Sequence, residues 1–194
     1  MYKLPELFEG MRGVCVRHLQ AAFDDLSNRK QWFIAEPAMQ DPAMKEKGAL
    51  AREGPLSLPF RCDALVMSPD GNTLTPQIFT IEKRWNFSPA EFDYAGLRIS
   101  LSPCHWENIK VSISGEPQVI AAGVKAWFET AFVPSVKRGE HEIQNAVHDI
   151  SNFAADGATT VFTLDCGSMP VDHMFALFDL MIDAHASRVE LSMP

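Results

Sequence analysis

The chain has 194 residues, of which 46% are hydrophobic and 22% charged, with a formal net charge of −8 at pH 7. This length and composition allow one sizeable core and exclude a disordered protein. The 17 basic residues form no cluster that could neutralise a run of phosphates, and no apolar run is long enough to span a bilayer, so we expect neither a nucleic-acid partner nor a membrane protein.

The four cysteines lie far apart, and no CxxC motif suggests a zinc knuckle or a thioredoxin-like site. The N-terminal residues include charged side chains and lack the apolar segment of a signal peptide. We therefore expect a cytoplasmic protein with reduced cysteines, without a metal or a cofactor.

The first third of the chain predicts a helix, a strand and a loop. Residues 5–28 predict an amphipathic helix, because apolar side chains recur at helical spacing. The apolar stretch 32–34 predicts an edge strand. Residues 36–58 have no periodicity and contain several prolines, which indicates a long irregular loop of the kind that forms lids and binding loops.

Alternating apolar and polar residues predict strands in the middle of the chain. The apolar positions of two segments are Leu97, Ile99 and Leu101, and Ile109, Val111 and Ile113. Residues 61–67 and 77–83 predict another strand pair around a turn at 68–72, where Pro and Gly favour a reversal. Together these patterns predict a four-strand antiparallel β-meander with one solvated face.

The last third predicts an alternation of helices and strands. Helices are expected from Pro117 to Pro134, from about 139 to 156 with Gly157 as a stop, and over 170–185. Strands are expected over 159–165 and 188–193, parallel to each other if they share a sheet. The sequence thus predicts an α+β protein, a meander packed against helices and followed by an α-β-α-β segment, in one domain over 1–194. A boundary could fall only near 134–139.

The segment Cys104-His105-Trp106-Glu107 is the first candidate site. It lies in the link between two predicted strands, where Cys104, His105 and Glu107 supply the side-chain types of a nucleophile-and-base site. No glycine-rich elbow accompanies them. The alternative is an ordinary strand link whose tryptophan packs on the sheet.

The second candidate is a polar face of the predicted helix 139–156, formed by His141, Asn145 and His148. The two histidines would lie two turns apart, roughly 10 Å along the axis, which is too far for one zinc ion. This pattern favours a solvated face without a metal. His141 remains a catalytic candidate if the fold brings it to Cys104 or His105.

Three carboxylates form an acidic stripe on the predicted helix 170–185: Asp172, Asp179 and Asp183. They are a solvated face, a binding surface for a basic protein partner, or a divalent-cation site, although no EF-hand-like loop supports the last. Cys166 precedes this helix, but no arginine follows to hold a phosphate, so we expect an inert core thiol.

The sequence does not specify an activity, because it lacks GxxxxGK[ST], GxGxxG and GxSxG motifs. One hypothesis is an acidic interaction module, an inhibitor or immunity-like binder of a partner protein. The alternative is a small-ligand-binding protein or an enzyme with a pocket under the loop 36–58.

Overall fold

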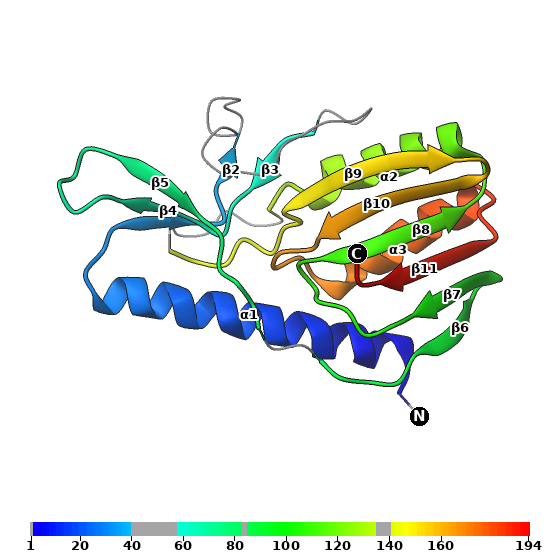
Figure 1. Ribbon diagram of the computed structural model, residues 1–194, viewed down its shortest axis with the longest axis horizontal. Coiled ribbons are helices and arrows are strands. Elements are labelled where there is room, and N and C mark those ends of the chain that lie inside the picture. The colour runs from blue at the N-terminus through cyan, green and yellow to red at the C-terminus, as the bar shows by residue number, and fades with distance from the viewer. Residues whose placement is uncertain (1, 40–57, 83–84, 135–140) are drawn as a thin grey trace.

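The structure, a computed structural model, describes residues 2–39, 58–82, 85–134 and 141–194 (Figure 1). Within these residues the strands form sheets of six, three and two strands. The elements in chain order are α1 (Leu4–Asn28), β1 (Phe33–Ala35), β2 (Ala38–Met39), β3 (Phe60–Arg61), β4 (Ala64–Met67), β5 (Leu74–Gln77), β6 (Ala90–Tyr94), β7 (Leu97–Leu101), β8 (Ile109–Ser114), α2 (Pro117–Ala131), β9 (Asp149–Asp156), β10 (Thr159–Asp165), α3 (Val171–Asp183) and β11 (Arg188–Ser192).

The large sheet has the strand order β6-β7-β11-β8-β10-β9, and the small sheet has the order β1-β4-β5. Helices α2 and α3 pack against each other and against one face of the large sheet, while the opposite face is turned toward the viewer in Figure 1. Helix α1 runs along the molecule below both sheets. The large sheet is therefore covered by helices on one face.

The alternating residues of β7 and β8 explain this one-sided cover. Their apolar positions are buried against the helices, whereas Arg98 and Lys110 on the other face are exposed. From α2, Trp127 and Phe128 belong to the same buried core. Burial of apolar side chains on one face contributes about 25 cal/mol per Å² and fixes which face of each strand points inward.

The predicted α+β class is confirmed, but its finer meander is not. Strands β6 and β7 are antiparallel neighbours, as are β4 and β5. However, β4 and β5 belong to the small sheet, and β11 lies between β7 and β8. Strand β11 pairs parallel with β7 and antiparallel with β8, so a long-range pairing replaces the expected contact between sequence neighbours.

The predicted helix over 139–156 is wrong where the structure describes it. Residues 149–156 form β9, which pairs antiparallel with β10, and residues 143–148 have no regular structure. Asp156 pairs with Thr159, so Gly157 and Ala158 form a two-residue hairpin turn, and Gly157 has φ +58°. Gly157 is thus the first of the two turn residues, a position that requires positive φ and favours glycine, and not the stop of a helix.

The other predicted helices match α1, α2 and α3 closely. Of the irregular loop 36–58, residues 40–57 lie outside the described residues, as do residues 135–139 of the suggested boundary region. None of the helices in the described ranges combines the length and the apolar character needed to cross a bilayer.

Candidate functional site

A cleft of about 490 Å³ opens where β10 ends and β8 begins. Segments far apart in the sequence line it, namely residues 78–81, the link between β7 and β8, the first part of β9, the end of β10, and Met193. One set of lining side chains is apolar: Ile78, Phe79, Ile81 and Met193. The ionisable ones are His105, Glu107, Asp149 and Asp165. The cleft therefore combines apolar surface with three carboxylates.

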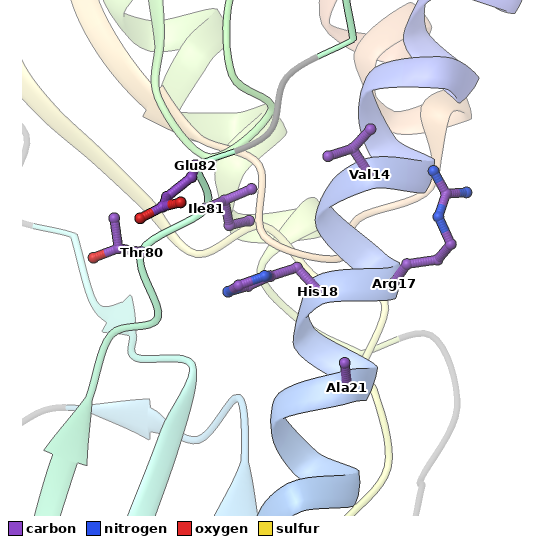
Figure 2. A pocket seen from close by; sticks show the side chains of 7 residues that line it. All are labelled: Val14, Arg17, His18, Ala21, Thr80, Ile81 and Glu82. Carbon is purple, nitrogen blue, oxygen red and sulfur yellow. The ribbon is translucent and has the colours of Figure 1, made fainter.

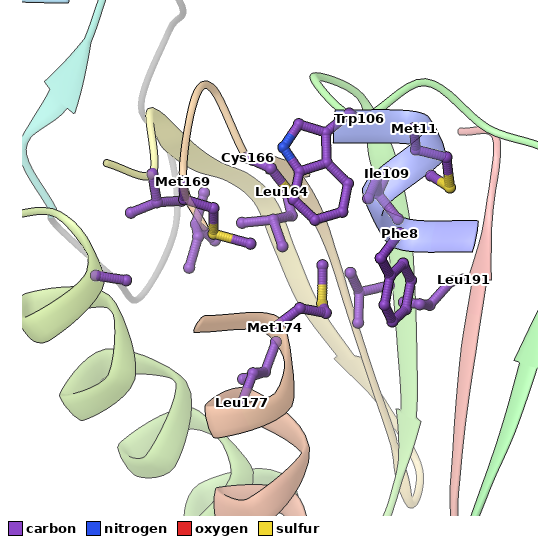
Figure 3. Packing of buried hydrophobic residues seen from close by; sticks show 14 of the residues in the cluster. Phe8, Met11, Trp106, Ile109, Leu164, Cys166, Met169, Met174, Leu177 and Leu191 are labelled. Atoms are coloured by element: carbon purple, nitrogen blue, oxygen red, sulfur yellow. The ribbon is translucent and has the colours of Figure 1, made fainter. Parts of the chain in front are cut away.

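The link between β7 and β8 directs two side chains to this cleft. Cys104 and Trp106 are buried, whereas the alternate residues His105 and Glu107 line the cleft. The ring centroids of Trp106 and Phe8 of α1 lie 6.0 Å apart. Figure 3 shows the indole of Trp106 among Met11, Leu164 and Cys166. This buried anchor fixes the direction of the two residues beside it.

Glu107 is a carboxyl group with unusual titration. Its side chain is 25% exposed, and Oε1 lies 3.4 Å from Nδ1 of His105. Burial, together with the charge of Asp63, raises the pKa of Glu107 to about 7. Near neutral pH, Glu107 can therefore either hold or release a proton.

Behind the cleft wall, a buried histidine contacts three carboxylates. Nε2 of His148 lies 2.7 Å from Oε1 of Glu36, and Nδ1 lies 3.3 Å from Oδ1 of Asp63 and 3.8 Å from Oδ2 of Asp165. The His148 side chain is 1% exposed and that of Glu36 is 0%, whereas that of Asp165 is 23% exposed. Asp165 thus belongs both to this cluster and to the cleft. We call these four residues the His148 cluster.

Both ring nitrogens of His148 face carboxylate oxygens, which accept hydrogen bonds but do not donate them when ionised. Only an imidazolium has a hydrogen on each nitrogen. Burial alone would lower the pKa of His148, but the charge of Asp165 and the bonds to Asp63 and Glu36 outweigh it and raise the pKa well above its ordinary value. Conversely, burial alone would raise the pKa of Glu36, but the hydrogen bond and the charge of His148 outweigh this effect and lower the pKa.

The backbone holds the cluster together from both sheets. The amide of Glu36 donates to the carbonyl of Asp63 at 2.8 Å, and the amide of His148 donates to the carbonyl of Asp165 at 2.9 Å. Arg61 connects the two halves, because its amide donates to the carbonyl of His148 at 2.9 Å and its guanidinium donates to the carbonyl of Glu36. The guanidinium also donates to the carbonyl of Phe132 at 2.9 Å.

Gly167 provides space for the imidazole. A Cβ atom at this position would lie 2.1 Å from Cδ2 of His148, and the residue has φ +50°. The amide of Gly167 also donates to Oδ1 of Asp165 at 2.9 Å. The residue after Cys166 therefore has to be glycine for reasons of space and of backbone conformation.

The structure brings together only two of the predicted catalytic residues, His105 and Glu107. Cys104 is buried, and burial with the charge of Glu107 raises the pKa of its thiol to about 12. His141 stacks on Phe33 with ring centroids 4.2 Å apart and does not line the cleft. The catalytic roles of these residues remain predictions.

The acidic stripe is exposed on α3, as expected for a solvated or partner-binding face. Asp172, Asp179 and Asp183 are all exposed, and Asp179 accepts a hydrogen bond from the hydroxyl of Tyr94 at 3.0 Å. Their role in binding a basic protein remains a prediction. Cys166 is fully buried, and burial raises the pKa of its thiol well above the ordinary value.

The His148 cluster was missed because the segment before β9 was interpreted as a helix with a solvated face. One sequence signal could have revealed it. Glu36, Asp63 and Asp165 each adjoin a short apolar segment that forms a strand, and a carboxylate at such a position needs a partner if the strand end is buried.

A second hollow of about 640 Å³ lies between α1 and residues 80–82 (Figure 2). His18 points across it toward the segment of Ile81, while the guanidinium of Arg17 points away. Fewer segments and fewer ionisable groups converge here than in the cleft, although its volume is larger. In the described ranges, no group of three or more His, Cys, Asp and Glu side chains has the arrangement of a metal site.

Comparisons of the chain with protein-family models, with curated proteins and with solved structures found no match.

Proposed function

We propose that the protein binds a small organic cation, a ligand with a positively charged amine and an apolar body, in the cleft beside the His148 cluster. The observation that carries this proposal is the lining of the cleft. Glu107, Asp149 and Asp165 lie in one cleft with apolar side chains, and none of its described lining residues is a lysine or an arginine. Pockets of this size with a few polar groups on an apolar surface are typical of small-ligand sites.

The titration of the lining residues supports a cationic ligand. The pKa values of Glu107 and Asp165 are raised to about 7, in each case first by burial. An ammonium group placed near them would replace the protons that they hold and favour the ionised carboxylates. Binding should therefore release protons near pH 7, and the affinity should rise with pH between 6 and 8.

The charges behind the wall favour the same class of ligand. His148 is a single positive charge among Glu36, Asp63 and Asp165. The nearby guanidinium of Arg61 donates to the carbonyls of Glu36 and Phe132. When Asp165 is ionised, this part of the protein has an excess of negative charge, and a cation in the cleft would balance it.

The proposal can be tested with three aromatic probes of similar shape: phenethylamine, phenethyl alcohol and 3-phenylpropanoate. In isothermal titration calorimetry, we expect phenethylamine to bind about tenfold more tightly than the alcohol, which corresponds to one close charge interaction. We expect no binding of the anion. Titrations in buffers of different ionisation enthalpy should reveal the released proton.

The matched variants are Glu107→Gln and Asp156→Asn. Glu107→Gln should remove most of the preference for the amine, whereas Asp156→Asn, on the exposed end of β9, should leave it unchanged. Equal binding of all three probes would refute the cationic preference. Failure of all three to bind would count against the ligand-binding function itself.

An enzymatic role for the same cleft is a narrower form of this proposal. A carboxyl group with a pKa near 7 suits proton transfer at neutral pH, and His105 lies beside it. The other hypothesis from the sequence, an inhibitor or immunity-like module that binds a basic partner, is supported by the exposed carboxylates Asp172, Asp179 and Asp183 on α3. The proposed cytoplasmic location is supported by four buried cysteines that are all free.

A further inference from the structure

The two sheets meet at the His148 cluster. On the small-sheet side, Glu36 directly follows β1 and Asp63 directly precedes β4, two strands that pair antiparallel. On the large-sheet side, His148 directly precedes β9 and Asp165 ends β10. The contacts of the imidazole with Glu36 and Asp63 therefore join one sheet to the other.

The Nδ1–H group of His148 has two possible acceptors. Oδ1 of Asp63 lies 3.3 Å from Nδ1, and Oδ2 of Asp165 lies 3.8 Å from it. One hydrogen cannot serve both carboxylates well. Asp165 has another donor, the amide of Gly167, for its other oxygen. Ionised Asp165 thus competes with Asp63 for the imidazolium. Its negative charge also repels the carboxylate of Asp63.

The state of Asp165 changes near neutral pH. Burial raises its pKa to about 7, with a further increase from the charge of Asp63 and an opposing effect from His148. Because Asp165 also lines the cleft, either a proton or a bound cation can neutralise it. The charge of this one carboxylate therefore depends both on the pH of the solution and on a ligand in the cleft.

We propose that Asp165 and His148 couple the cleft to the small sheet. When a proton or the positive charge of a ligand neutralises Asp165, the Nδ1–H of His148 donates its hydrogen bond to Asp63 alone. This bond then holds the small sheet more tightly against the large sheet. His148 is a positioning residue in this arrangement, since it does not line the cleft. The ligand part of the inference rests on the proposed function, whereas the proton part does not.

Other ionisable groups lie near the cluster and define the controls. The charge of Asp63 raises the pKa of Glu107, and the charge of Asp149 raises the pKa of Asp165. The thiols of Cys15 and Cys166 stay protonated, because burial raises the pKa of each well above its ordinary value. Arg61 adds a fixed positive charge near Glu36. Within the described residues, Asp165 is the group that both contacts the imidazole and lines the cleft.

The direction of the effect follows from proton linkage. When the small sheet opens and Asp165 becomes more exposed to water, its pKa returns toward the ordinary value of 3.8, below the value of about 7 in the closed state. The closed state therefore binds the proton more tightly, and opening becomes easier as the pH rises toward 8. For one linked proton, we expect opening to increase about tenfold between pH 6 and pH 8.

Amide hydrogen exchange of the ligand-free protein, corrected for the intrinsic pH dependence, measures this opening. Amides of β1 and β4 should exchange about tenfold faster at pH 8 than at pH 6, while those of β10 should exchange more slowly than the β1 and β4 amides at both pH values. Asp165→Asn should remove this difference. Glu107→Gln is the control, because Glu107 lines the same cleft and titrates near the same pH but does not contact the imidazole.

Asp63→Asn provides a second, independent variant. It removes the negative charge by which the small sheet attracts the imidazolium, so its β1 and β4 amides should exchange faster than those of the wild type at pH 6 and depend little on pH. The coupling is overturned if Asp165→Asn keeps the wild-type pH dependence, or if Glu107→Gln abolishes it equally.

A ligand titration separates this inference from the proposed function. At pH 8, saturating phenethylamine should slow exchange in β1 and β4 of the wild type and not in Asp165→Asn. If phenethylamine binds without slowing exchange, the coupling fails and the proposed function stands. If phenethylamine does not bind while the pH effect and its loss in Asp165→Asn are observed, the proposed function fails and the proton-operated coupling stands.

Discussion

Glu107 shows how a single partly buried carboxyl group can set the pH dependence of stability. Its pKa in the folded protein is about 7, compared with an ordinary value of 4.5. Between these values the folded state holds a proton that the unfolded chain has released, so the unfolding free energy falls as the pH rises through this window. Asp165 acts in the same direction.

Glu107→Gln should therefore make the protein more stable at alkaline pH. We expect its unfolding free energy to exceed that of the wild type by roughly 2 kcal/mol at pH 8 and to differ little at pH 5, as measured by urea denaturation. Glu129→Gln, at an exposed position of α2, is the control and should show no such difference. Parallel curves for Glu107→Gln and the wild type would contradict the buried, proton-holding state.

Some residues of the site could be predicted from the sequence, and others could not. His105 and Glu107 could be nominated because polar residues in a tight link between strands point to function. His148 could not, because its environment consists of Glu36, Asp63 and Asp165, which are brought to it from other segments by β1, β4 and β10. A carboxylate beside a short apolar segment indicates that a partner is needed, but which residue is the partner depends on tertiary contacts.

At the level of elements, the two glycines that flank β10 differ in a way that can be measured. Both have positive φ, +58° for Gly157 and +50° for Gly167. A Cβ atom at Gly157 would meet nothing within 4 Å, whereas at Gly167 it would overlap the ring of His148. The first glycine is required by the backbone alone, and the second also by packing.

Gly157→Ala should lower the unfolding free energy by about 1 kcal/mol, the usual strain of a left-handed residue that has a Cβ atom. Gly167→Ala should lower it by about 2 kcal/mol more, because the ring of His148 has to move within a packed interior. Thermal denaturation of the two variants gives the comparison. Equal effects would mean that the ring moves at no cost.

The helices could be predicted well because their apolar stripes are local patterns, as for α1, α2 and α3. Strand β9 could not, since its residues Ile150 and Phe153 also fit helical spacing. Pairing with β10 decides its conformation, and tertiary context often overrides such patterns. Gly157 is the local signal for the hairpin turn, but a glycine also commonly follows the end of a helix.

For the whole molecule, β11 is the strand on which the large sheet depends. Leu191 is 1% exposed and pairs with Leu101 of β7 and Val111 of β8. Leu191→Ala should therefore lower the unfolding free energy by about 3 kcal/mol, the typical effect of truncating a buried leucine. Glu190→Ala, on the exposed face of the same strand, should change it by less than about 0.5 kcal/mol. Similar values for both would contradict the central role of β11.

The position of β11 also has a consequence for the order in which the protein is made. A ribosome completes β6, β7, β8, β9 and β10 before it adds β11, so the two halves of the large sheet exist before the strand that joins them. Until then β7 and β8 each present an unpaired edge, of the kind that recruits other chains. We therefore expect the yield of folded protein to rise with chaperones that shield strand edges until β11 is in place.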